Sequence, residues 1–292
     1  MIYILENDKL RVKVSSLGAE LQSIRRMEDG TEYLWQGDSQ YWARRASNLF
    51  PVCGRLWENQ YVYRSKTYPM GSHGFARGKE WEVIHQKPAA LTLQLKPDAE
   101  TLDAYPFRFA LEMTYTLVED SLTVTTIVRN EDDKEMPFAV GGHPGFNVPL
   151  AEGTAFEDYK LVFDEPCQPL RFLCDENCFH LGKMALFPLV GDRVLPLQHS
   201  LFDDDAIFLE NASRGVTLRS DKTERSVHLA FPDSPYLGIW HTPRTEAPFV
   251  CIEPWVAAPA PAGSVANLED RQDMIQLEPS GIYRNSYTLT FQ

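Results

Sequence analysis

The stretch "FRFALEMTYTLVEDSLTVTTIVRN", residues 107–130, decides the fold class of this chain. In its first half, large apolar side chains occupy every second position, with polar or small residues between them. The segment "VEDS" at 118–121 breaks this alternation, and "LTVTTIVRN" resumes it. A period of two is typical of strands that bury one face. The stretch therefore predicts two long strands joined as a β-hairpin.

The same period continues on both sides of this hairpin. It is present in "ALTLQLKP" at 90–97 and in "YRNSYTLTFQ" at 283–292. Shorter apolar runs separated by turn residues indicate further strands at 205–210, 215–220, 226–231 and 248–253. Helical patterns are scarce, and the best short candidate is "LEDRQDMIQ" at 268–276. The pattern predicts an all-β protein, a large antiparallel β-sandwich with few short helices.

Composition indicates one compact domain without a nucleic-acid or membrane partner. Hydrophobic residues make up 43% of the 292 residues, which is enough for a substantial core. No linker-like segment or internal repeat divides the chain, so we expect a single domain over residues 1–292. The net charge of −13 repels phosphate backbones and anionic membranes, and no Lys/Arg stripe offsets it.

The cysteines and the N-terminus indicate a cytoplasmic protein. Five cysteines are scattered at uneven spacing and contain no C-x-x-C pair, which favours reduced thiols over a disulfide framework or a zinc ribbon. The opening "MIYILENDKLRVKV" lacks the basic start and continuous apolar stretch of a signal peptide, and no segment is long enough for a membrane span.

Four ionisable residues occur beside unusual backbone punctuation. Arg55 follows a Cys-Gly turn, His73 lies between glycines, His143 stands in "GGHPGFNVPL", and Glu253 follows the apolar run "FVCI" and precedes Pro254. Catalytic groups of β proteins usually lie at strand ends or in loops, and a carboxylate after a buried run is expected to have a raised pKa. Each also has a structural alternative. Arg55 could form a surface ion pair, and His73 could lie in an exposed turn. His143 could be a core histidine bonded to a backbone carbonyl, and Glu253 could belong to a buried polar network.

Two further sets of residues fit a sugar site without proving one. The acidic run Asp203–Asp205 opens an apolar strand, and we expect at least two of its carboxylates to be solvated while one could accept hydrogen bonds from vicinal hydroxyls. Tryptophan faces stack on the apolar faces of sugars, although tryptophans more often fill a core or its rim; the candidates are Trp42, Trp57, Trp240 and Trp255.

Taken in order, six motifs resemble those of one enzyme family. They are "LGAELQSI" (17–24), "NLFPVCGRL" (48–56), "HGFAR" (73–77), "GGHPGFNVPL" (141–150), "LFDDDAIFLE" (201–210) and "CIEPW" (251–255). In this combination the chain resembles the aldose 1-epimerase (galactose mutarotase-like) family, in particular its LacX-like branch. The resemblance runs over nearly the whole chain.

The resemblance implies a β-supersandwich that interconverts the α and β anomers of a monosaccharide without cofactor or metal. It implies that Glu253 is the general base at the C1 hydroxyl and that His143 is the general acid at the ring oxygen. It assigns substrate binding to His73, Arg55, Asp205 and Trp255.

The reaction itself requires only proton transfers. Opening a cyclic hemiacetal removes a proton from the anomeric hydroxyl and delivers one to the ring oxygen, so one base and one acid on opposite sides of the ring suffice, each contributing ~10²–10⁴-fold. With ordinary pKa values of about 4.3 for Glu and about 6.5 for His, we expect an ionised Glu253 and a partly protonated His143 at neutral pH. A nearby carboxylate would raise the pKa of this histidine further.

Three other functions use the same residue types. A sugar-binding or sensing protein of this fold would keep the site without turning the sugar over. A glycoside hydrolase needs a second catalytic carboxylate, and none stands in a comparable motif. A metal site could use His73, His143 and Glu253, but no short ligand spacing supports it.

The substrate is expected to be an aldose, neutral or phosphorylated, bound by a monomer or homodimer. A phosphosugar would need a basic rim, and Arg44 and Arg45 are adjacent. Because consecutive residues of an extended chain point to opposite faces, at most one of them would serve such a site. The acidic net charge favours a neutral sugar. The Cys-Gly pair before Arg55 and Gly78 after "HGFAR" depart from the family pattern and bear on which sugar is bound.

Overall fold

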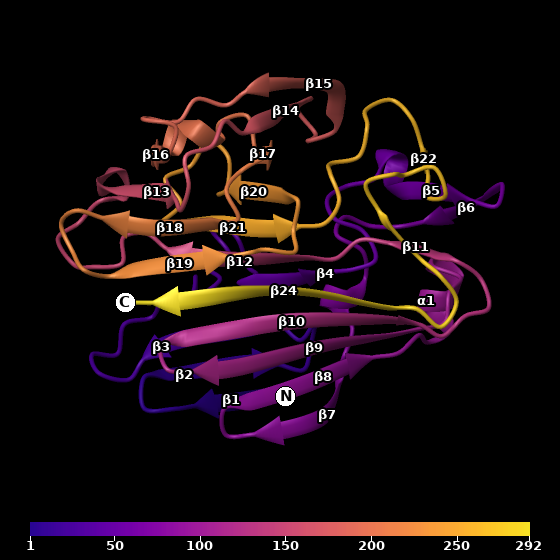
Figure 1. Ribbon diagram of the computed structural model, residues 1–292, viewed down its shortest axis with the longest axis horizontal. Helices are drawn as coiled ribbons and strands as arrows, with labels where there is room; N and C mark the ends of the chain where they lie inside the picture. Colours follow the sequence, from indigo (N-terminus) through magenta and orange to yellow (C-terminus); the bar gives the residue numbers. More distant parts are fainter.

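The computed structural model describes residues 1–292 and consists mainly of strands (Figure 1). The predicted hairpin is present: β9 (Phe109–Val118) and β10 (Ser121–Asn130) pair antiparallel, with Val118 opposite Ser121. On β9 the apolar side chains of the alternating pattern are buried. This hairpin belongs to the larger of two large antiparallel sheets.

The larger sheet has nine strands, with the C-terminal strand in its middle (Figure 1). Its order is β16 (Val194–Pro196), β13 (Tyr159–Phe163), β18 (Gly215–Ser220), β19 (Ser226–Ala230), β24 (Ile282–Phe291), β10, β9, β8 (Ala90–Leu95) and β7 (Glu82–Lys87).

The second sheet has seven strands and carries the residues of the candidate site. Its order is β15 (His180–Leu186), β14 (Leu170–Cys174), β17 (Ile207–Glu210), β20 (Tyr236–Trp240), β21 (Phe249–Trp255), β12 (Gly141–Asn147) and β4 (Ala46–Leu49). All neighbouring pairs in both large sheets are antiparallel.

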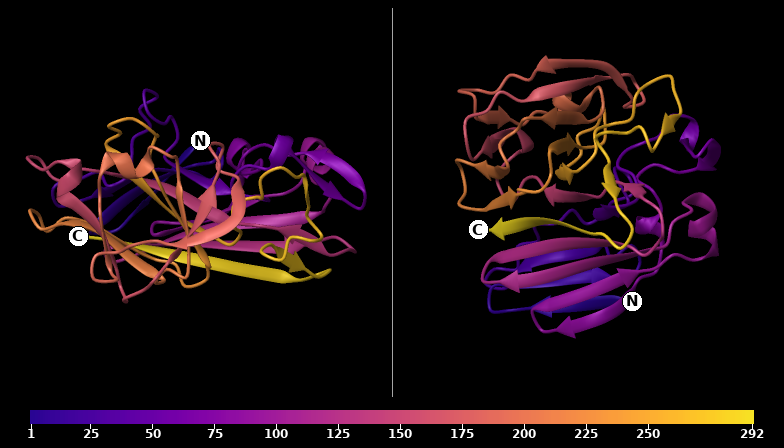
Figure 2. Two further views of the ribbon diagram at one scale, coloured as in Figure 1. Left: turned by 90° about the horizontal axis from the view of Figure 1, so that it is seen from above. Right: turned by 45° about the vertical axis from the view of Figure 1, so that its right-hand side comes forward.

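Smaller elements complete the molecule, which is elongated and flattened when seen from above (Figure 2). The short strands are β1 (Ile2–Glu6), β2 (Leu10–Ser15), β3 (Leu21–Arg26), β5 (Gln60–Tyr63), β6 (Lys66–Pro69), β11 (Met136–Phe138), β22 (Ala266–Asn267) and β23 (Ile275–Leu277). The helices are α1 (Ala99–Ala104) and the 3₁₀ turns Trp57–Asn59, Ala76–Gly78, Phe156–Asp158 and His199–Phe202. No helix has the length and hydropathy needed to cross a membrane.

The two large sheets pack on one core. A single cluster of 74 buried residues includes side chains of both sheets. At one contact between them, a Cβ on Gly142 of β12 would lie 2.9 Å from the Tyr287 ring of β24, so only glycine lets the sheets approach this closely. The predicted antiparallel β-sandwich is confirmed, while the assignment of residues 1–292 to a single domain stays a prediction that this shared core supports.

The helix predicted at 268–276 is wrong. The segment forms turns and then enters β23 at Ile275. Leu268 and Ile275 are seven residues apart, as on one face of a helix, but Leu268 lies in a turn and Ile275 begins β23. The only α-helix, α1, begins where Asp98 accepts a hydrogen bond from the Thr101 backbone N–H (2.7 Å).

Candidate active site

A cavity of about 280 Å³ opens over the middle of the seven-stranded sheet and gathers all six predicted site residues. Segments far apart in the sequence contribute to it, from Trp42 before β4 to Pro259 after β21. The predicted residues that line it are Arg55, His73, His143, Asp205, Glu253 and Trp255.

His143 and Glu253 face each other from neighbouring strands. The register of β12 on β21 pairs Gly141 with Trp255 and Gly145 with Cys251, which puts position 143 opposite position 253. His143 Nε2 lies 3.4 Å from Glu253 Oε2. The expectation that both residues sit at strand ends or turns is wrong, because both strands continue past them.

The glycines around His143 serve close packing instead of a turn. A Cβ at Gly141 would lie 2.8 Å from Cδ1 of Trp255, and one at Gly145 would lie 3.2 Å from the ring of Trp42. Both tryptophans line the cavity. The glycines of "GGHPGFNVPL" therefore leave room for the aromatic walls on either side of His143.

Burial sets the protonation of this pair. Glu253 is 2% exposed and His143 8%. Burial, reinforced by the negative charge of Asp205, raises the pKa of Glu253 well above its usual range. Burial also lowers the pKa of His143 to about 3. Both shifts run against the expected ionised Glu253 beside a protonated His143. Desolvation outweighs the nearby carboxylate and favours a single proton in the pair, on Glu253.

His73 occupies a strained turn that fixes its tautomer. Its φ of 63° lies in the left-handed region, and its backbone N–H donates to the Gly54 carbonyl (2.7 Å). In return its Nδ1 accepts the Gly54 N–H (3.1 Å). Burial lowers the pKa of His73 well below its usual value. The ring is thus neutral, with its proton on Nε2 as a hydrogen-bond donor.

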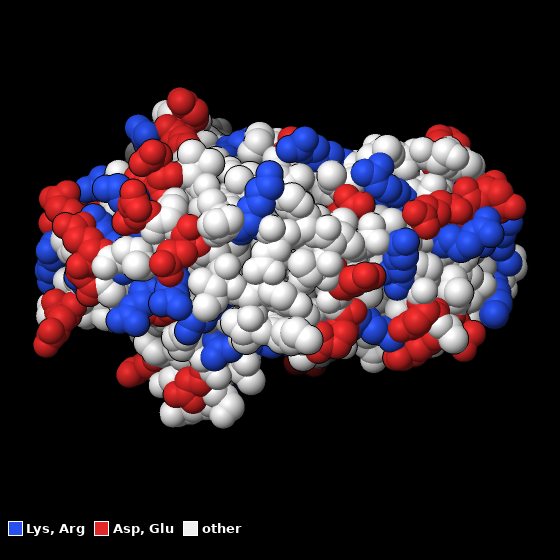
Figure 3. Space-filling model, turned by 90° about the horizontal axis from the view of Figure 1, so that it is seen from below, with Lys and Arg blue, Asp and Glu red and all other residues white.

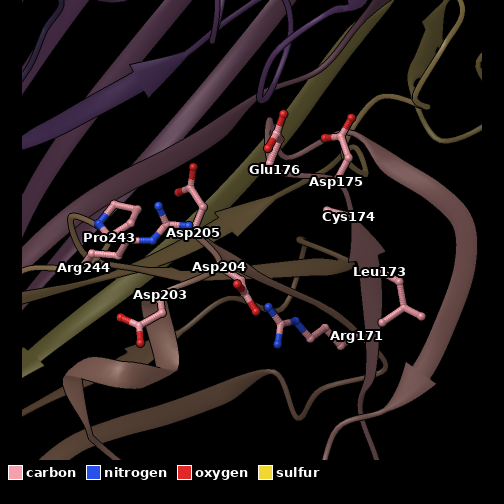
Figure 4. A pocket seen from close by; sticks show the side chains of 10 residues that line it. All are labelled: Arg171, Leu173, Cys174, Asp175, Glu176, Asp203, Asp204, Asp205, Pro243 and Arg244. Carbon is pink, nitrogen blue, oxygen red and sulfur yellow. The ribbon is translucent and has the colours of Figure 1, made fainter.

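Asp205 is the member of the acidic run that faces the cavity. Its Oδ1 accepts the indole N–H of Trp240 (2.7 Å), and its Oδ2 lies 3.7 Å from Nη2 of Arg55. Asp203 and Asp204 line only a wider neighbouring hollow of about 590 Å³, which shares Asp205 with the cavity (Figure 4). This hollow contains no facing acid–base pair, so the smaller cavity is the better candidate for catalysis.

Aromatic rings form the walls of the cavity. Trp42 stacks on the His143 ring at 4.7 Å between centroids and an interplanar angle of 23°, and Trp240 meets the same ring edge to face. The buried Trp255 Nε1 and His143 Nδ1 have no hydrogen-bond partner within the protein. Unsatisfied buried polar atoms cost free energy and are enriched at functional sites.

Sequence reasoning missed several residues of the site. Arg77 lines the cavity, and its position in "HGFAR" was the available signal. Trp42 and Trp240 were named among four tryptophans that could stack on a sugar or fill the core. Neither lies in a local motif that shows what its ring contacts. Ser72 and Cys178 also line the cavity and carried no signal beyond their neighbours in sequence.

One group of side chains could hold a metal ion, and it differs from the set considered above. The ligand atoms of His143, Cys251 and Glu253 all lie within 4.8 Å of one another, whereas His73 does not belong to the group. All three residues are buried. Burial raises the pKa of the Cys251 thiol well above its usual range, so an ion there would have to displace a firmly held proton.

Comparison with known proteins matches this chain to one family. The family model for aldose 1-epimerase matches residues 1–266. The plasmid-encoded protein LacX of Lactococcus lactis subsp. lactis is 37% identical over 295 residues, which cover 98% of this chain and 98% of that protein.

Two solved structures share the fold over the whole chain. A galactose mutarotase related enzyme from Lactobacillus acidophilus has 34% identity and a TM-score of 0.95, covering 100% of this chain and 97% of the other. A galactose mutarotase-like protein from Lactobacillus casei has 34% identity and a TM-score of 0.94, with 100% of both chains covered. The predicted galactose mutarotase-like supersandwich is confirmed.

Proposed function

This chain belongs to the aldose 1-epimerase family, and from that premise we propose that it interconverts the α and β anomers of a monosaccharide with Glu253 and His143 as its proton-transfer pair. Family membership supports an isomerase that acts on a sugar. The reaction, the catalytic residues and the independence from a cofactor are the parts that we add.

What carries the proposal is that His143 and Glu253 face each other, with Nε2 and Oε2 3.4 Å apart. Burial raises the pKa of Glu253 and lowers that of His143 to about 3, which favours one proton between them. A pair with a single proton contains one acid and one base at the same time. When one group protonates the ring oxygen and the other accepts the C1 hydroxyl proton, the pair ends with the same number of protons. Ring closure on either face of the aldehyde reverses both transfers, so no external acid or base is needed.

The spacing of the pair fits a ring edge better than the two faces of a ring. The sequence suggested a base and an acid on opposite sides of the sugar ring. At 3.4 Å, His143 Nε2 and Glu253 Oε2 are too close for that arrangement. The C1 hydroxyl oxygen and the ring oxygen are both bonded to C1, so two adjacent groups reach them from one side. Before the ring opens, the shared proton passes from Glu253 Oε2 to His143 Nε2. Glu253 then accepts the C1 hydroxyl proton while His143 protonates the ring oxygen, which leaves the pair with its one proton back on Glu253.

The remaining predicted residues would orient the sugar. Neutral His73 can donate from Nε2 to a sugar oxygen, and Asp205, held by Trp240 and next to Arg55, can accept from vicinal hydroxyls. Trp255 contributes an apolar wall. A cavity of about 280 Å³ is at the small end of ligand sites, which run from roughly 300 to 1,000 Å³.

A sugar-binding protein that does not catalyse is the second candidate. The same cavity would serve it, but binding alone gives no reason to bury an unsolvated acid and an imidazole side by side, which costs free energy. This cost favours catalysis.

The test is the rate at which fresh α-glucose and α-galactose reach anomeric equilibrium, followed by polarimetry. The proposal requires acceleration over buffer and its loss in Glu253→Gln. If no aldose or aldose phosphate is turned over while calorimetric titration still shows sugar binding, the binding-protein function replaces it.

Location and assembly follow as further proposals. All five cysteines are free, which supports a reducing, cytoplasmic compartment. A monomer or homodimer remains the expected assembly.

A further inference from the structure

The loop between β14 and β15, residues 175–179, holds the guanidinium group of Arg55. Arg55 Nη1 donates a hydrogen bond to the Asn177 carbonyl (2.8 Å). Arg55 Nη2 lies 3.7 Å from Asp205 Oδ2, which is too long for a hydrogen bond. The loop carbonyl, and not the Asp205 carboxylate, therefore fixes the direction in which the donors of Arg55 point.

The gap between Arg55 and Asp205 fits a sugar hydroxyl. Both residues line the cavity. A hydroxyl oxygen beside both can accept a hydrogen bond from Nη2 and donate one to Oδ2, because a hydroxyl group is donor and acceptor at once. Trp240 already holds Asp205. The position of Arg55 is the other half of this hydroxyl-binding site.

The side chain of Asp175 fixes the shape of the loop. Its Oδ1 accepts the backbone N–H groups of Asn177 (2.9 Å) and Phe179 (2.9 Å). Cys178, which stands between them, has a φ of 65°, in the left-handed region that a residue with a side chain rarely adopts. Backbone hydrogen bonds from Cys178 N–H to the Asp175 carbonyl (3.1 Å) and from Asp175 N–H to the Phe179 carbonyl (2.9 Å) close the turn. One carboxylate oxygen thus holds the backbone on both sides of the strained residue.

The loop also packs on the segment that carries Arg55. The Phe179 ring meets the Trp57 ring edge to face, with 5.0 Å between centroids, and Phe179 is buried. Trp57 begins a 3₁₀ turn two residues after Arg55. The loop therefore contacts this segment twice, through the Asn177 carbonyl and through the Phe179 ring.

A neighbouring carboxylate separates the hydrogen bonds of Asp175 from its charge. Asp175 and Glu176 lie next to each other in the loop after Cys174, and both line the hollow of about 590 Å³ (Figure 4). Glu176 is exposed and accepts no hydrogen bond from the protein. The two residues bring the same charge to nearly the same place, so only Asp175 can shape the turn.

We propose that Asp175 is a positioning residue for substrate binding, which holds the Asn177 carbonyl where that carbonyl aims Arg55 at a sugar hydroxyl. The inference rests on the proposed function and adds a residue to its binding site. Asp175 does not line the cavity, so it acts through Arg55 and not on the sugar itself.

Three variants test the role of the Asp175 side chain, with kcat and KM taken from anomerisation rates in NMR exchange spectroscopy on the best aldose. Asp175→Ala should raise KM about 5–10-fold and change kcat less than about twofold, because both hydrogen bonds to the carboxylate are lost. Asp175→Asn keeps an Oδ1 acceptor without the charge, and Glu176→Ala removes a charge without a hydrogen bond. Both should keep the wild-type KM within about twofold.

A double-mutant cycle with Arg55→Lys tests whether Asp175 acts through Arg55. If it does, the double variant should have the KM of Arg55→Lys alone, because the group that Asp175 positions is already gone. Independent effects of the two changes, a wild-type KM in Asp175→Ala or a raised KM in Glu176→Ala would overturn the inference and leave the mutarotase function standing. A wild-type protein that accelerates no aldose would reject the proposed function, and the inference with it.

Discussion

At the scale of single residues, the shared proton of Glu253 and His143 determines how the rate depends on pH. Burial keeps the proton on Glu253 above the ordinary pH range of carboxyl groups and keeps His143 neutral down to about pH 3. The one-proton state therefore extends from about pH 3 to well above the ordinary carboxyl range.

The predicted pH profile of kcat/KM follows from the raised pKa of Glu253 and the lowered pKa of His143. It should show no acid limb near 6.5, the ordinary histidine value, and should fall on the alkaline side as Glu253 loses its proton. Rates for a neutral aldose measured from pH 5 to 9 would show this. An acid limb with an apparent pKa near 6.5 would mean that His143 titrates like an exposed histidine, contrary to its burial.

Trp240 is predicted to act on substrate binding through Asp205. Replacing it in Trp240→Phe removes the indole donor 2.7 Å from Asp205 Oδ1 but keeps an aromatic ring. Hydrogen bonds to charged groups contribute about 1.5–3 kcal/mol, and part of this should appear as a KM for sugar raised about 3–10-fold with a smaller change in kcat. An unchanged KM would show that Asp205 is positioned without Trp240.

At the scale of secondary-structure elements, β12 is packed through its glycines. In Gly141→Ala the added Cβ would lie 2.8 Å from Trp255, so the ring must move. We expect a loss of about 1–3 kcal/mol in the free energy of unfolding, as for other overpacked sites, together with a reduced mutarotation rate. Urea unfolding measures the change in the free energy of unfolding.

The matched control is Gly71→Ala. Nothing lies within 4 Å of a Cβ at Gly71, and this glycine is exposed. The control should change neither stability nor rate. If Gly141→Ala behaved like Gly71→Ala, the close packing of β12 on Trp255 would not matter for the site.

The sequence predicts elements and residues better than it predicts how they face one another. The alternation at 107–117 predicts β9 because every second side chain is buried, which is a local property. Glu253 and His143 have recognisable motifs, but their facing positions depend on the register of β12 on β21, between segments about a hundred residues apart. Leu268 and Ile275 imitate a helix because an i, i+7 spacing of apolar residues does not by itself specify backbone geometry.

At the scale of the whole molecule, charge is dispersed over the surface. Seen from below, Lys and Arg side chains are interspersed with Asp and Glu around a largely uncharged centre, and no basic stripe crosses this face (Figure 3). That nucleic acid is not a partner stays a prediction.

Buried histidines should make global stability fall at acid pH. Burial lowers the pKa of His241, which is fully buried, to about 4. A lowered histidine pKa means that its contribution to stability is present above about 6.5, its unfolded value, and is lost as the pH falls toward 4. Between pH 6.5 and 5.0 this loss amounts to about 1.5 kcal/mol for one residue.

His241→Asn isolates that contribution. Between the same two pH values, the free energy of unfolding of the wild type should fall by about 1.5 kcal/mol more than that of the variant, because net-charge effects are common to both. Urea unfolding at pH 6.5 and 5.0 gives the comparison. Equal losses in the two proteins would mean that His241 titrates alike in the folded and unfolded chains.

The most direct test of the central claim is the anomerisation rate of the purified protein and of His143→Asn and Glu253→Gln on its best aldose. General acid–base groups contribute ~10²–10⁴-fold each, so each variant should lose at least about a hundredfold in kcat while its free energy of unfolding, measured in urea, shows that it remains folded. If either folded variant kept the wild-type rate, the pair of Glu253 and His143 would not be the proton-transfer centre.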